Sequence, residues 1–526
     1  MAEVLVAGAQ PERPANASLT DWIAVAAGSL GALLATLDIS ITNSALPQIQ
    51  GQIGATGSEG TWIATGYLMS EIVMIPLAAW LTRVFGLRRF LIGTALIFTL
   101  FSMMCGLSSS LGMMIAGRIG QGFAGGAMIP TAQTIMRTRL PAHQLPIGTT
   151  MFGMTVILGP LLGPVIGGWL TENINWRWCF FLNLPVSIAL ITLLLTGLPS
   201  ERMNLERFIK ADWLGILGLA LGLSSLTVVL EEGQREHWFD SALIIWLTLA
   251  TLIGFFLIAL GQLRAATPIL QLRLLANRSF GSVLLIGTAV GAGLYGTAYL
   301  VPQFLGIVAG YNAQQSGAIM LLSGIPAFLL MPLLPRMLGR LDLRLLVGTG
   351  LLLYWASCFL DTLLTTQSVG HDFIGSQLLR GCGQILVMMP LSQLSMGSVE
   401  ARDAGDAAGL YNMSRNLGGT IGLALLGVLM DRRTHFHDDR LREGIHANSQ
   451  LAQDHMASST ASALAQNGDP STAQLQAFEQ LANDIAHQAA VIAYNDAFHV
   501  LGLAMLACLP LIFLLKRRSA QAGYRK

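Results

Sequence analysis

Residues 147–170 read IGTTMFGMTVILGPLLGPVIGGWL, a run of 24 residues without a charged side chain. A helix that crosses a hydrocarbon layer of about 30 Å needs about 20 apolar residues. This run is therefore long enough to cross a membrane. Its glycine–proline pairs, Gly159-Pro160 and Gly163-Pro164, predict a bent helix that a neighbouring helix can approach closely.

Similar runs continue along the chain, and we identify fourteen candidate membrane spans. They lie near 22–46, 61–82, 89–108, 111–136, 147–170, 178–198, 212–231, 241–263, 279–305, 313–335, 344–363, 372–396, 404–430 and 492–515. The ninth and tenth runs are interrupted by Pro302, Pro326, Pro332 and Pro335. Hydrophobic residues make up 53% of the 526 residues and charged residues 11%, whereas a soluble domain carries about 25% charged residues. This excludes a water-soluble enzyme, and a net charge of +1 argues against a nucleic-acid partner.

The basic residues give the direction of the spans. Fifteen lysines and arginines lie in the even-numbered loops, against two, Arg177 and Arg235, in the short odd-numbered loops. Because basic loops face the cytoplasm, we expect both termini to be cytoplasmic. The expected organisation is a cytoplasmic tail (1–21), a six-helix half (22–200), two extra transmembrane helices (201–265), a second six-helix half (266–515) with a periplasmic extension (431–491), and a cytoplasmic tail (516–526).

The chain also repeats itself. Pro47-Gln48 recurs as Pro302-Gln303, and Arg118 followed by Met128-Ile129-Pro130 recurs as Arg380 followed by Met388-Met389-Pro390. Two related halves of six helices are typical of secondary transporters, whose binding site lies between the halves near the membrane midplane. We therefore expect an all-α polytopic membrane protein with a central cavity.

Ionisable residues inside the spans are functional candidates, because a charge in hydrocarbon costs several kcal/mol. Asp38 and Arg118 both lie roughly 10–12 Å below the outer surface at 1.5 Å per residue, so the two could meet. Such a carboxylate can load and release a proton, although a static buried ion pair is the alternative. Glu71 could bind a proton or a cationic substrate, or make a helix–helix hydrogen bond. Arg380 and Arg415 could pair with cavity carbonyls or attract an anion.

Three motifs carry a family resemblance. Residues 37–47, LDISITNSALP, resemble the first-helix signature of fourteen-span drug:proton antiporters, and Arg118-Ile119-Gly120-Gln121-Gly122 resembles the RxxQG motif of the fourth helix. The fifth span carries glycines and prolines that resemble the antiporter motif of the family's fifth helix, namely Gly159, Pro160, Gly163, Pro164, Gly167 and Gly168. Their order and spacing are similar to those of the EmrB/QacA type within the major facilitator superfamily, over nearly the whole chain.

This resemblance implies a major facilitator fold with two extra helices, in the bacterial inner membrane. It implies a proton-coupled multidrug efflux antiporter that needs no cofactor and is driven by the proton gradient. The implied partners are hydrophobic small-molecule drugs, protons, an EmrA-type periplasmic adaptor and a TolC-type outer-membrane channel. Proton coupling is expected to rest on Asp38, Arg118 and Glu71. The segment 431–491 could dock the adaptor, or it could be a lid or a disordered loop.

One loop departs from the family pattern. After the second span the superfamily usually reads GxLaDrxGrr, whereas residues 79–89 read AWLTRVFGLRR, with Arg83 at the acidic position. A charge relay through that aspartate is therefore not carried over. Arg88 and Arg89 could bind the C-terminal end of a neighbouring helix through its dipole, or could simply anchor the loop at the cytoplasmic surface.

Methionines, tyrosines and arginines along the spans are candidates for the substrate cavity, since adaptable side chains suit varied apolar ligands. The predicted lining is Tyr67, Met151, Met154, Tyr295, Tyr299, Arg380, Tyr411 and Arg415. Most such residues in membrane proteins face lipid or packing. Neither GxxxxGK[ST] nor HExxH occurs, so we predict neither ATP-driven pumping nor a metal site. The remaining rivals are an importer or uniporter of the same fold, and a membrane enzyme acting on lipid, which would need clustered polar groups.

Overall fold

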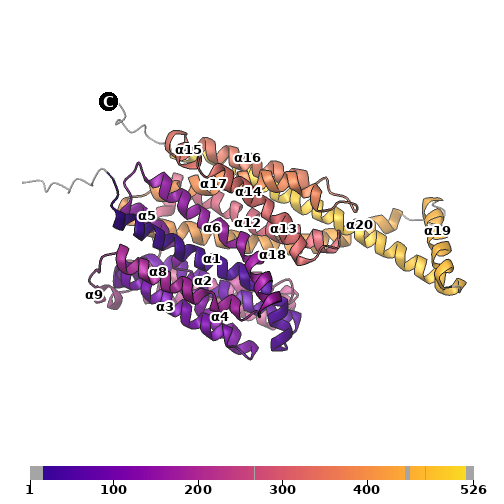
Figure 1. Ribbon diagram of the computed structural model, residues 1–526, viewed down its shortest axis with the longest axis horizontal. Helices are drawn as coiled ribbons and strands as arrows, with labels where there is room; N and C mark the ends of the chain where they lie inside the picture. Colours follow the sequence, from indigo (N-terminus) through magenta and orange to yellow (C-terminus); the bar gives the residue numbers. More distant parts are fainter. Residues whose placement is uncertain (1–15, 266, 445–449, 468, 517–526) are drawn as a thin grey trace, which may run out of the picture.

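The computed structural model describes residues 16–265, 267–444, 450–467 and 469–516, and it is helical throughout these ranges, with no strand (Figure 1). The α-helices are α1 (Leu19–Ile53), α2 (Gly57–Phe85), α3 (Leu87–Gly106), α4 (Leu111–Gly125), α5 (Met128–Arg139), α6 (Leu145–Asn173), α7 (Trp178–Phe181), α8 (Asn183–Gly197), α9 (Leu205–Ile209), α10 (Trp213–Glu232), α11 (Ala242–Arg264), α12 (Arg278–Ile307), α13 (Ala313–Leu321), α14 (Ile325–Leu330), α15 (Leu334–Arg340), α16 (Leu343–Asp361), α17 (Phe373–Gly397), α18 (Ala404–Gly444), α19 (Gln450–Asn467) and α20 (Pro470–Ala507).

Eleven helices of the described chain are long and apolar enough to cross a membrane, and a bent pair adds a twelfth. That pair is the predicted tenth span, where the helix breaks after Leu330 and turns by 62°. The ninth span, in contrast, runs through Pro302 as one helix, α12. The two remaining candidates are α4 with α5, and α17, which do not meet the same criterion. The chain is therefore a multi-pass membrane protein, and fourteen spans stay a prediction.

The helices gather into two bundles with a helix pair beside them. In the first bundle α1 packs on α5, α6 and α8, while α4 packs on α2 and α3. In the second, α12 packs on α18, α16 on α17, and α20 on α16 and α18. The pair α10–α11 attaches through α10 to both α2 and α18. Helix α10 therefore touches both bundles, whereas the predicted domain boundaries remain untested.

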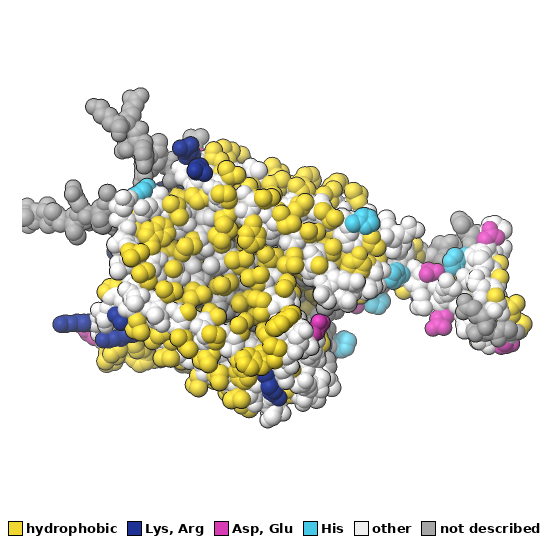
Figure 2. Space-filling view, viewed as in Figure 1, with side chains coloured by type: hydrophobic (Ala, Val, Ile, Leu, Met, Phe, Trp, Pro, Cys, Tyr) yellow, Lys and Arg dark blue, Asp and Glu magenta, His cyan; other side chains and the backbone are white. Residues whose placement is uncertain are grey.

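The bundle has two unlike ends. Most of the arginines and lysines in short loops lie at one end, which we call the basic end, and we call the opposite end the far end. Figure 2 shows a broad hydrophobic surface between the two ends. The start of α1 reaches the basic end, where the backbone N–H of Ala17 donates to Gln144. The last helix returns there, because the backbone N–H of Lys516 donates to Ser279.

The segment 431–491 projects from the far end as a helical extension (Figure 1). Helix α18 continues to Gly444 and α20 begins at Pro470, so both run well beyond the length that a membrane requires, and α19 lies between them. Residues 471–491 lie within α20, so this part of the extension is a continuous helix. Arg433 and His437 of α18 both contact the Asp496 carboxylate of α20, at 2.6 and 2.8 Å, which ties the base of the extension together.

Candidate functional site

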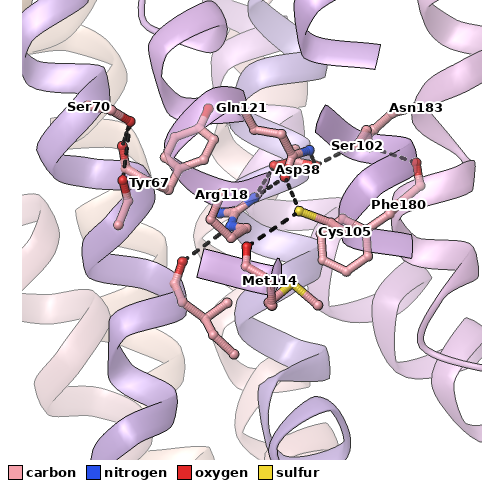
Figure 3. A network of polar contacts seen from close by, with 12 residues as sticks. Asp38, Tyr67, Ser70, Ser102, Cys105, Met114, Arg118, Gln121, Phe180 and Asn183 are labelled. Carbon is pink, nitrogen blue, oxygen red and sulfur yellow. Dashed lines mark hydrogen bonds and ion pairs between the residues drawn. The ribbon is translucent and has the colours of Figure 1, made fainter. Parts of the chain in front are cut away.

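Asp38 is the centre of a buried polar network in the first bundle (Figure 3). The carboxylate lies on α1 and is 1% exposed. It accepts hydrogen bonds from Arg118 at 2.5 Å, from Gln121 at 2.9 Å and from Asn183 at 2.6 Å. Arg118 and Gln121 lie on α4, one turn apart on the same face, and Asn183 begins α8. One carboxylate thus joins three helices.

A second layer of contacts fixes the donors. The Arg118 guanidinium lies 4.3 Å from the centre of the Tyr67 ring and donates to the carbonyl of Ile63 at 3.3 Å, both on α2. Asn183 donates to Ser102 of α3 at 2.8 Å. Because charge-assisted hydrogen bonds are roughly twice as strong as neutral ones, the ionised form of Asp38 is firmly held. Loss of its charge would break the ion pair with Arg118, which binds Oδ2, while Oδ1 still accepts from Gln121 and Asn183.

The predicted contact between Asp38 and Arg118 is therefore present. The motif that contains Arg118 also supplies Gln121, since the two are three residues apart. Asn183 and Ser102 are not predicted as site residues, because isolated polar residues in apolar runs give no pattern from which to infer a partner. One signal that could have found them is that a polar side chain inside a membrane span needs a hydrogen-bond partner.

The glycines of α6 lie against the helix that carries Asp38. A Cβ atom on Gly159, Gly163 or Gly167 would overlap Thr36, Ser40 or Ser44 of α1, respectively. The hydroxyl of Ser40 also donates to the carbonyl of Pro160 at 3.3 Å. This bond gives a partner to a backbone carbonyl in the stretch where prolines interrupt the helix's own hydrogen bonds. Gly168 differs, since nothing lies within 4 Å of its Cβ position. The antiporter-like motif thus forms a close contact between α1 and α6.

Glu71 lies apart from this network, on the side of α2 that faces the second bundle. The carboxylate is 3% exposed and borders a cavity of about 220 Å³ between α2, α10, α12 and α18. The cavity is lined by Leu68, Glu71, Ile72, Thr227, Tyr295, Asn416 and Thr420. Arg415 of α18 is buried beside it, and its Nη2 donates to Asn416 at 3.4 Å.

The other predicted cavity residues are not brought together. Met154 borders a separate cavity of about 330 Å³ between α6, α14, α15 and α17, while Met151 packs against the core of the first bundle. Tyr67 stacks on Arg118. Tyr411 is buried near Gly287, and Tyr299 is 37% exposed. Of the eight predicted lining residues, Tyr295 borders the first of these two cavities and Met154 the second.

Arg380 forms an ion pair with a carboxylate that the sequence pattern does not single out. Its guanidinium contacts Asp361, the last residue of α16, and both side chains are buried. Asp361 ends an apolar run next to a polar loop, a position that usually faces water, so the sequence alone gives no reason to place it inside. The Arg380 charge is thus neutralised by Asp361 rather than directed at cavity carbonyls.

The two bundles are joined at the basic end. Arg83 of α2 makes a two-bond ion pair with Asp406 of α18, at 2.8 and 3.0 Å. Gln133 of α5 bonds with both Ser392 and Asn412, at 3.1 and 2.8 Å. Arg83, where the family pattern has an aspartate, therefore meets an acidic partner of the opposite sign.

The predicted helix-end contact of Arg88 is confirmed. Its guanidinium donates to the carbonyl of Leu198 at 3.2 Å, directly after α8 ends at Gly197. Cations are favoured at this position because the unpaired carbonyls of a helix C-terminus carry negative partial charge. The contact ties the α2–α3 loop to α8 at the basic end.

Comparison with known proteins agrees with this architecture. The model of the Major Facilitator Superfamily matches residues 28–423. The Colistin resistance protein EmrB of Acinetobacter baumannii is 32% identical over 488 residues, which cover 92% of this chain and 94% of that protein. The Multidrug export protein EmrB of Escherichia coli (strain K12) is 30% identical over 491 residues, which cover 93% and 94%.

Two solved structures share the fold. The human organic anion transporter MFSD10 (TETRAN) superposes with a TM-score of 0.61 over 94% of this chain and 99% of that one, at 15% identity. The proton:xylose symporter XylE superposes with a TM-score of 0.57 over 93% of this chain and 95% of that one, also at 15% identity. At this identity the likeness concerns the arrangement of helices and not the substrate.

Proposed function

The chain belongs to the Major Facilitator Superfamily, a family of membrane transporters and not of enzymes, and from this premise we propose that it exports hydrophobic or amphiphilic compounds in exchange for protons. The relatives named Multidrug export protein EmrB support the choice of substrate class. The observation that carries the proposal is the Asp38 network, because it places one ionisable carboxylate where its charge holds three helices together.

The proposed coupling follows from that geometry. An ionised Asp38 binds Arg118, Gln121 and Asn183 and so fixes α1 against α4 and α8. A protonated Asp38 loses the ion pair, and a buried Arg118 without its partner is costly. The two protonation states therefore favour different helix arrangements. A ligand that prefers one arrangement is thereby linked to the proton, which is what antiport requires.

The contact between α1 and α6 supports exchange rather than free flow. The glycines of α6 let its backbone approach α1 along the stretch that includes Thr36, Ser40 and Ser44. Such close packing leaves no space for water between the helices. We propose that it prevents protons from crossing without substrate. A uniporter or importer of the same fold would not need this seal.

The surroundings of the transporter are proposed on the same basis. The basic end faces the cytoplasm of a bacterial inner membrane, because the short loops there carry most of the arginines. The extension formed by α18, α19 and α20 then lies in the periplasm, where it docks an EmrA-type adaptor that leads to a TolC-type outer-membrane channel. Its length beyond the membrane and its exposed apolar side chains, Leu475 and Phe478, support this role.

Reconstitution tests the proposal. Purified protein in liposomes should move the fluorescent cation ethidium against its gradient when a pH gradient is imposed, and the movement should stop when the gradient is collapsed. The Asp38→Asn variant should insert and bind ethidium but lose the driven movement. Normal uphill transport by that variant would contradict the proposed coupling, and transport only downhill by the unchanged protein would favour the uniporter.

A further inference from the structure

Asp38 needs a route by which protons reach it, since Asp38 and Arg118 are each 1% exposed. Tyr67 is the first group beyond this pair. Its ring lies on Arg118, and its hydroxyl is buried without a hydrogen-bond partner among the described residues. Tyr67 and Glu71 are four residues apart on α2 and therefore lie on one face of that helix. The Tyr67 hydroxyl makes no hydrogen bond to Asp38 or to Glu71, so the next group that can accept a proton on this side is the Glu71 carboxylate.

Glu71 is an unpartnered carboxylate that borders a cavity. It is 3% exposed, and no described residue donates a hydrogen bond to it. The charges that act on it are those of Arg415 and Arg118. A buried carboxylate without a donor is costly when ionised, so it is favoured as a proton carrier over a structural role. Polar side chains, Thr227, Tyr295, Asn416 and Thr420, line this small cavity together with Glu71, so it suits water.

Helix α10 forms one wall of this cavity. Ser224, Thr227 and Glu231 are spaced by three and four residues and so share one face. Ser224 donates to the carbonyl of Met69 on α2 at 3.0 Å, and Thr227 borders the cavity. Thus a face of the extra helix pair belongs to the cavity between the two bundles.

Glu231 lies one turn further toward the far end on the same face. One of its carboxylate oxygens is buried without a hydrogen-bond partner among the described residues. Its neighbour Glu232 is different, because it accepts from Thr65 at 2.8 Å and Thr61 at 3.1 Å and pairs with Arg235 at 2.9 Å. Glu232 is therefore anchored by its donors, whereas Glu231 has a free oxygen.

Tyr295 of α12 lines the same cavity as Glu71. Its side chain borders the cavity, and the charges of both Glu71 and Glu231 act on it. The charged and titratable groups around this set are Glu232 and Arg235 from α10 and the loop that follows it, Arg118 from α4, and Arg415 from α18. Helix α11, on the other side of α10, carries only Arg264, at the basic end.

We propose that α10 provides a proton route from the far end to Glu71. Glu231 takes a proton from water at the far end, and water in the cavity carries it past Thr227 and Tyr295 to the Glu71 carboxylate, so that Glu71 gains the proton that Glu231 loses. The inference rests on the proposed function, and it gives the extra helix pair a part in coupling.

The test compares Glu231→Gln with Glu236→Gln, a matched control at the same end. Glu236 contacts Arg235 and Ser241 and does not border the cavity. In liposomes, Glu231→Gln should slow ethidium transport driven by a pH gradient by about tenfold or more, as expected for the loss of a proton-transfer group. Exchange of ethidium at equal pH, which needs no net proton movement, should stay within about twofold, as should both activities of Glu236→Gln. Glu231→Asp should recover part of the driven rate.

The outcomes separate the two proposals. A driven rate for Glu231→Gln equal to that of the unchanged protein overturns the route through α10 and leaves the antiport proposal standing. An equal loss of driven transport and exchange overturns it too, because the residue is then structural. Absence of any pH-driven transport by the unchanged protein overturns the antiport proposal and the route together.

Discussion

Arg118 and Arg380 stand at corresponding places in the two halves, on α4 and α17, and each is neutralised by a buried aspartate. In the first half the aspartate comes from α1, three spans earlier, and is also bound by Gln121 and Asn183. In the second half it is Asp361, at the end of α16, the helix that directly precedes α17. Arginines at corresponding positions of the two halves thus connect different pairs of helices.

The two ion pairs differ in which helix movements they prevent. A pair between consecutive helices secures a hairpin whose members already pack along their length. The pair of Asp38 with Arg118 joins α1 to α4, which share few other contacts, so breaking it lets these two helices move relative to each other. We conclude that the Asp38 pair is suited to coupling and the Asp361 pair to stability.

Removal of one charge should have the largest effect on stability in either half. Arg380→Met leaves Asp361 buried without a partner, which should cost about 3–5 kcal/mol, whereas Asp361→Leu combined with Arg380→Met should regain most of it. Thermal unfolding in detergent measures both. The matching pair of variants at Asp38 and Arg118 should behave alike in unfolding, but here the double variant should not transport.

The comparison fails in two ways that the same measurements detect. Loss of pH-driven transport by the stable Asp361/Arg380 double variant would mean that the second pair also couples. Retained driven transport by the Asp38/Arg118 double variant would mean that the first pair does not couple.

The contact between α1 and α6 should give the next largest effect. Gly163→Ala places a methyl group on Ser40, and such overpacking costs about 1–3 kcal/mol. Gly168→Ala is the control, because nothing lies within 4 Å of the added atom. Unfolding temperatures of the two variants compare the sites. Equal unfolding temperatures for Gly163→Ala and Gly168→Ala would show that α1 and α6 are not in close contact in the purified protein.

The contact between the halves at the basic end should have a smaller effect, since the Arg83 side chain is 35% exposed and such pairs contribute about 0.2–1 kcal/mol. Arg83→Ala should speed maleimide modification of a cysteine introduced at Thr134, which lies near Gly405 across the interface, by about two- to fivefold. The exchange of Arg83→Asp with Asp406→Arg should restore the slow rate. No recovery in the exchanged pair would show that the charges do not act together.

The smallest effect is expected in the extension. Hydrogen bonds from Thr472 and Ser471 lower the pKa of Asp469, which precedes α20, to about 2 from its ordinary value of 3.8. A lowered pKa means that the ionised form stabilises the folded helix start, fully above about pH 4 and progressively less as the pH falls toward 2. Hydrogen exchange of the first turn of α20 should rise over that window, and Asp469→Ala should remove the dependence. An unchanged pH profile in the variant would contradict the assignment.

The sequence predicts the spans well where apolar runs are long, and the meeting of Asp38 with Arg118 follows from their equal depth. It does not predict Asp361 or Asp406, because each lies near the end of a span, where a charge normally faces water. Nor does it predict that Thr227 of α10 and Tyr295 of α12 line one cavity, because that depends on how the extra helices attach to the bundles. Depth along a helix can be read from sequence, but the neighbour at that depth cannot.

The most direct test of the account is proton release on substrate binding. Purified protein in weakly buffered detergent solution is mixed with ethidium, and a pH indicator follows the release while tryptophan fluorescence follows binding. The account predicts release by the unchanged protein and by Asp361→Asn, and none by Asp38→Asn, although all three bind. Equal release by Asp38→Asn would contradict the claim that this carboxylate exchanges the coupled proton.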